Sequence, residues 1–60
     1  MMNLEFRVHD GKVMMLDYEV DNLFKAKGII RAYRQNNRKY YVRKECLGKY
    51  KIYAELRMDL

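Results

Sequence analysis

The 60-residue sequence has no serine, threonine, proline or tryptophan, and it has one cysteine and one histidine. Without serine or threonine it lacks the hydroxyl nucleophiles of most covalent enzymes. A single cysteine excludes a disulfide within the chain, and Cys46 with His9 matches no familiar zinc-ligand spacing. We therefore expect neither enzymatic activity nor a cofactor or metal ion.

Long apolar segments are also absent, since no run approaches the ~20 residues that span a membrane. We expect no signal peptide and no membrane association, and a lone free cysteine suits the reducing cytoplasm. The length allows one small domain, residues 1–60. Because half of the residues are hydrophobic, disorder is not expected. Small domains often gain stability by oligomerisation, so a homodimer is left open.

Charge is distributed unevenly along the chain, whose formal net charge is +5. Residues 1–24 hold two basic and five acidic side chains, whereas residues 25–51 hold ten basic side chains and one acidic side chain. Such asymmetry indicates an anionic partner, although a basic surface also keeps a small protein soluble.

The N-terminal third has the pattern of a β-hairpin. Apolar and polar residues alternate over Asn3–His9, the dipeptide Asp10-Gly11 favours a turn, and Lys12–Val20 supplies the second strand. A three-residue loop, His9-Asp10-Gly11, would pair Phe6 with Met14 and so place apolar side chains of the two strands opposite each other. A two-residue Asp10-Gly11 loop would pair Phe6 with Met15. We expect the first register.

The C-terminal third, residues 38–57, has the pattern of a second hairpin, closed by Cys46-Leu47-Gly48. This loop places Val42 opposite Ile52 on an apolar face. On the other face it places Tyr41 opposite Tyr53. There it also sets Arg43 opposite Lys51, a like-charge pair that a bound anion could relieve.

Residues 21–35 admit two interpretations. A helix would place Leu23, Ala26, Ile29, Ile30 and Tyr33 on one stripe. It would begin at Asp21 or Asn22 and end at Asn36 or Asn37. A strand over 29–35 is the alternative, but its alternation is poor. We favour the helix although Gly28 lies in its middle.

The predicted fold is therefore α+β, with two β-hairpins forming one antiparallel sheet and one central helix (ββαββ) across a face. The alternative is an all-β small barrel of the SH3 kind. The expected core consists of apolar residues from both hairpins and the helix: Leu4, Phe6, Met14, Leu16, Leu23, Ala26, Ile30, Tyr33, Tyr40, Val42, Ile52, Ala54 and Leu56.

The sheet face opposite this core suggests a function, because it combines basic and aromatic side chains. Phosphates attract the cations, and bases stack on aromatic rings. The sequence thus predicts a small nucleic-acid-binding module for DNA or RNA. Its predicted contacts are Arg31, Arg34, Arg38, Lys39, Tyr41, Arg43, Lys44, Lys49, Lys51 and Tyr53. The alternative is a phage-type protein-interaction module that covers an acidic or anion-binding surface of a host enzyme or nucleoprotein.

The opening segment Glu5–Tyr18 resembles the start of the YopX family of small phage proteins. Phe6, Arg7, Asp10 and Lys12, followed by Met14 and Met15, carry the resemblance. It covers about a quarter of the chain and ends at Tyr18. It implies a phage-related origin and a β-rich fold, and it implies no particular activity.

Overall fold

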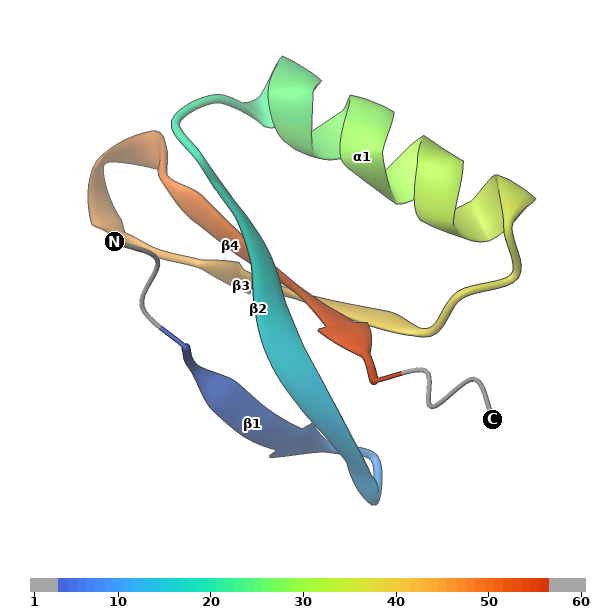
Figure 1. The fold of residues 1–60 in the computed structure, drawn as a ribbon. Helices are drawn as coiled ribbons and strands as arrows, with labels where there is room; N and C mark the ends of the chain where they lie inside the picture. The colour runs from blue at the N-terminus through green and yellow to red at the C-terminus, as the bar shows by residue number, and fades with distance from the viewer. Residues whose placement is uncertain (1–3, 57–60) are drawn as a thin grey trace.

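The computed structural model describes residues 4–56, and they form a four-stranded antiparallel sheet with one helix against it (Figure 1). The elements in chain order are β1 (Phe6–His9), β2 (Lys12–Val20), α1 (Leu23–Gln35), β3 (Tyr40–Lys44), the short 3₁₀ segment η1 (Cys46–Gly48) and β4 (Tyr50–Glu55). In space the strands follow the order β1-β2-β4-β3. The α+β class is confirmed. The helix over residues 23–35 excludes the all-β alternative.

Helix α1 begins and ends where its sequence signals predict. The Asn22 side chain accepts a hydrogen bond from the Lys25 backbone N–H at 2.8 Å, as an N-cap does. After the helix, Asn37 adopts the left-handed conformation with φ 54°, which asparagine tolerates better than most residues. Phe24 lies off the apolar stripe and is 86% exposed.

The two hairpins differ in how well the sequence predicts their register. In the C-terminal hairpin Tyr41 lies opposite Tyr53 and Val42 opposite Ile52, as expected. In the N-terminal hairpin Phe6 pairs with Met15, so the three-residue loop is wrong. Asp10 (φ 55°) and Gly11 (φ 75°) form a two-residue turn with the two positive φ angles of a type I′ turn.

Strand β2 contains a β-bulge at Asp17. Leu16 pairs with Tyr53 and Tyr18 pairs with the next residue of β4, Ile52, so Asp17 has no opposite partner. Its carboxylate accepts a hydrogen bond from the Tyr33 hydroxyl on α1. The extra residue therefore connects the middle of the sheet to the helix.

The core lies between α1 and one side of the sheet, which we call the helix face. Its fully buried cluster consists of Ala26 and Tyr33 from α1 with Ile52 and Ala54 from β4. Val20, Ile29, Tyr40, Val42 and Tyr50 pack around this cluster. Three other expected core residues, Leu4, Phe6 and Leu56, are exposed instead, because α1 does not cover β1 or the ends of the sheet (Figure 1). Leu23, the first residue of α1, is also exposed.

The opposite side of the sheet, which we call the inner face, is filled because the sheet curls toward it. Strands β1 and β3 are the two opposite edges of the sheet. The curl nevertheless brings the His9 ring of β1 onto the Tyr41 ring of β3, with the ring centroids 4.2 Å apart. Met14 and Tyr53 are buried on this side, with 2% and 0% of their surfaces exposed. The sequence predicts a single core between the helix and the sheet, whereas the structure has two layers of packed side chains, one on each side of the sheet.

Candidate nucleic-acid interface

Tyr41 and Tyr53, the two tyrosines predicted to contact bases, lie on the inner face, where other side chains cover them. Tyr53 is fully buried, its hydroxyl donates a hydrogen bond to the Glu5 carboxylate, and the Arg7 guanidinium lies 5.9 Å from its ring centroid. Tyr41 is half-buried beneath His9. Tyr53 therefore has no exposed ring surface on which a base could stack, and the ring of Tyr41 is partly covered. The strand β1, which follows the curl of the sheet, occupies the space that a stacked base would need.

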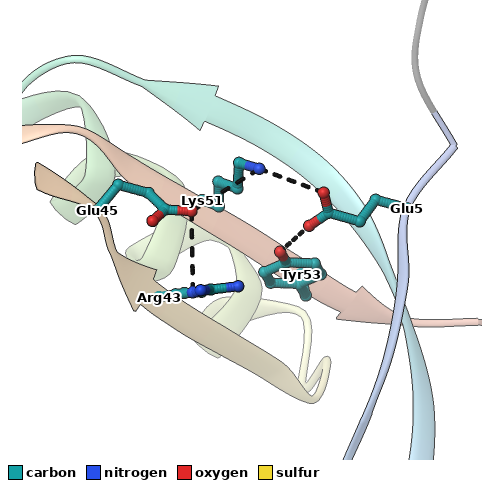
Figure 2. A network of polar contacts seen from close by, with 5 residues as sticks. All are labelled: Glu5, Arg43, Glu45, Lys51 and Tyr53. Atoms are coloured by element: carbon teal, nitrogen blue, oxygen red, sulfur yellow. Dashed lines mark hydrogen bonds and ion pairs between the residues drawn. The ribbon is translucent and has the colours of Figure 1, made fainter.

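Two cations of the inner face, Arg43 and Lys51, are neutralised by carboxylates of the same chain (Figure 2). Arg43 lies opposite Lys51 as predicted, and Glu45 lies 3.8 Å from the Arg43 Nε and 3.7 Å from the Lys51 Nζ. Glu5 lies 3.2 Å from the Lys51 Nζ on the other side. Glu45, the residue before η1, and Glu5, the residue before β1, thus supply anions to the like-charge pair, so no external anion is required.

Protonation equilibria reflect the same network. The hydrogen bond from Tyr53, and then that from Lys51, lowers the pKa of Glu5 below its ordinary value of 4.5. The hydrogen bond to Glu5 raises the pKa of Lys51, and burial followed by the bond to Glu5 raises the pKa of Tyr53. Glu5 is therefore ionised at neutral pH and joins the residue that precedes β1 to β4 through two side-chain contacts.

Arg38 is another predicted contact that the fold uses internally. Its guanidinium lies 5.1 Å from the Tyr33 ring centroid, and its Nη1 lies 3.7 Å from the Asp17 carboxylate. Its Nη2 donates to the Glu55 carbonyl oxygen at 3.4 Å. Burial, and then the hydrogen bond to Asp17, raises the pKa of Tyr33 above its ordinary range. This cluster fixes the start of β3 against the bulge in β2.

The other predicted cations are exposed, and none has a carboxylate partner among residues 4–56: Arg31, Arg34, Lys39, Lys44 and Lys49. Arg34 donates a hydrogen bond from Nε to the Tyr40 hydroxyl at 3.1 Å, which positions the guanidinium without cancelling its charge. These five residues come from α1, from β3 and its approach, and from the loop before β4.

Helix α1 gathers three of its exposed cations into one stripe, which the sequence prediction did not identify fully. Lys27, Arg31 and Arg34 line a shallow recess of about 390 Å³ around Ile30. We call these three cations the basic stripe. Lys27 was missed, although its spacing of four and seven residues from the arginines places all three on one side of a helix. The helix contains no acidic residue to oppose them.

Comparisons with protein-family models, with curated proteins and with solved structures find no match to this chain. The resemblance to the YopX family therefore stays a prediction. Within residues 4–56 no helix is long and apolar enough to cross a membrane.

Proposed function

We propose that this protein binds nucleic acid through the basic stripe of α1, with phosphates as the groups contacted. One observation carries the proposal: Lys27, Arg31 and Arg34 are exposed side by side and lack carboxylate partners in the described residues, unlike Arg43 and Lys51 on the inner face. A cation already paired within the fold releases little free energy on meeting a phosphate, because its charge is already compensated.

The dimensions of the stripe suit a phosphate backbone. From Lys27 to Arg34 the helix rises about 10 Å, at ~1.5 Å per residue. A single helix also fits the major groove of B-DNA, which is about 12 Å wide. The exposed lysines at positions 39, 44 and 49 add to the positive field that attracts a polyanion. Phosphate contacts position a protein without reading sequence, so we expect weak sequence preference.

Fluorescence-anisotropy titrations with single- and double-stranded oligonucleotides at several salt concentrations test the proposal. Three phosphate contacts predict a slope of log K against log salt near −2.7 for duplex DNA, or about −2.1 for single strands. Replacing Arg31 by alanine should weaken binding to all sequences about equally. It should also reduce the magnitude of the duplex slope by about 0.9.

Lys25→Ala is the matched control, since it removes the same charge from the same helix. Lys25 already lies 3.3 Å from Asp21, so its loss should change the slope much less. Equal effects of the two variants would show that only net charge matters. Absence of binding near physiological salt would refute the proposal and favour the alternative of an acidic protein partner.

A further inference from the structure

A row of exposed apolar side chains lies on the part of the helix face that α1 leaves uncovered. Leu4 and Val8 are each 75% exposed, Phe6 is 52% exposed, and Val13, which pairs with Val8, is 51% exposed. In the described part of the chain only six apolar residues are buried, so this row is large relative to the core. Clustered apolar surface of this kind marks an interaction site more often than isolated exposed residues do.

The same segment is an unpaired sheet edge. Strand β1 is terminal in the sheet, and within residues 4–56 no strand pairs with its outer side. The Leu16 N–H donates to the Glu5 carbonyl at 2.8 Å, so Glu5 and then Arg7 direct their backbone groups toward β2. The backbone N–H and C=O groups of Phe6 and Val8 consequently point outward, where they can pair with another strand.

The sequence of this edge is complementary to itself. In an antiparallel pair of two copies centred on Phe6, Leu4 lies opposite Val8 of the partner subunit, and Glu5 lies opposite Arg7 of the partner subunit. Apolar thus meets apolar on one face and opposite charges meet on the other. Centring the pair on Arg7 would instead place two arginines opposite each other. Charge therefore favours the register centred on Phe6 over the one centred on Arg7.

We propose that a second copy of this chain pairs antiparallel along β1, centred on Phe6, and joins the two four-stranded sheets into one continuous sheet. Such a contact is isologous and closes as a dimer. The two-fold axis of an antiparallel strand pair is perpendicular to the sheet. Both α1 helices, each with its basic stripe, therefore lie on the same side of the dimer. This inference does not depend on the proposed function.

Mass measurement tests the association directly. Sedimentation equilibrium over about two decades of protein concentration should show a shift from monomer to dimer as concentration rises. Phe6→Lys should abolish the dimer, because it places two cations at the two-fold axis. Phe24→Lys makes the same chemical change on α1, where the side chain is 86% exposed, and should leave the dimer intact. Circular dichroism shows whether both variants are folded.

Cysteine cross-linking tests the register, with exposed Cys46 first replaced by alanine. A hydrogen-bonded antiparallel pair has its Cα atoms about 5.5 Å apart, within the range of about 4.4–6.8 Å for disulfides. Phe6→Cys should therefore form a disulfide dimer with itself. Leu4→Cys and Val8→Cys should each remain uncross-linked alone and cross-link when mixed. A monomer at every concentration, or cross-linking of Leu4→Cys with itself, would overturn the proposal.

Discussion

Replacing Tyr53 by phenylalanine removes one hydroxyl from the inner face and leaves the ring in place. The hydroxyl donates to the Glu5 carboxylate, and hydrogen bonds to charged groups contribute about 1.5–3 kcal/mol. Glu5 retains Lys51, and its side chain is 36% exposed to water, so the lower end of that range applies. We expect the free energy of unfolding to fall by about 1.5 kcal/mol. The whole free energy of unfolding of a 60-residue domain is about 3–9 kcal/mol, so this loss is a substantial fraction of it.

Urea denaturation followed by circular dichroism measures this loss. The midpoint should fall while the dependence of the free energy on urea stays unchanged, because the surface exposed on unfolding is the same. The melting temperature should fall by about 6–12 °C, at roughly 4–8 °C per kcal/mol for a domain of this size. Nucleic-acid affinity should not change, because the Tyr53 ring has no exposed surface.

Tyr41→Phe is the matched control, because it deletes the same atom from the neighbouring ring. Its ring stacks on His9, and its hydroxyl has no hydrogen-bond partner in residues 4–56, so we expect little change. A cycle of Tyr53→Phe, Glu5→Gln and the double variant isolates the pairwise energy. If Tyr53→Phe were no more destabilising than Tyr41→Phe, the structural role assigned to the inner-face network would be refuted.

Three further changes test other parts of the fold. Glu5 has a lowered pKa, so its contribution to stability is present above its ordinary value of 4.5 and is lost as the pH falls through the lowered value. Urea midpoints measured across that range should fall less for Glu5→Gln than for the unaltered chain. Asn22→Ala removes the N-cap bond to Lys25 and should cost about 1 kcal/mol, measured by thermal unfolding. Gly11→Ala places a Cβ at a residue with φ 75° and should lower the free energy of unfolding by about 1–2 kcal/mol, also measured by thermal unfolding. An unshifted melting curve would contradict this prediction.

Local signals in the sequence predicted the C-terminal hairpin and the helix correctly. Gly48 ends a three-residue loop with φ 72°, which sets the pairing of Tyr41 with Tyr53. Asn22 and Asn37 mark the two ends of α1. In each case one residue with a distinct conformational preference determines the structure of its neighbours, so the information is local.

The predicted N-terminal register is wrong because turn chemistry outweighs apolar pairing in this hairpin. Asp10 and Gly11 both accept positive φ, which favours the two-residue loop, and the core does not require Phe6, which remains half exposed. The burial of Tyr53 could not be predicted either. It depends on the strand order and on the curl that brings β1 across β4, and neither has a local signal.

For the same reason, the sequence alone locates only some of the cations that the fold leaves exposed. Sequence counts of charge cannot distinguish a cation that meets a carboxylate of the same chain from one that faces solvent. Arg43 and Lys51 belong to the first kind, and Arg31 belongs to the second. The spacing of Lys27 with Arg31 and Arg34, by contrast, is a local signal that the sequence contains.

The bulge at Asp17 reverses the parity of β2. Before it, odd-numbered residues such as Met15 share the helix face with Ala54, and after it even-numbered residues such as Val20 do so with Tyr50. A substitution at position 17 keeps this phase, whereas deletion of the residue would exchange the two faces for every position on one side of it. The strand therefore behaves as two short segments in opposite phase, and it should tolerate changes of side chain at this point far better than changes of length.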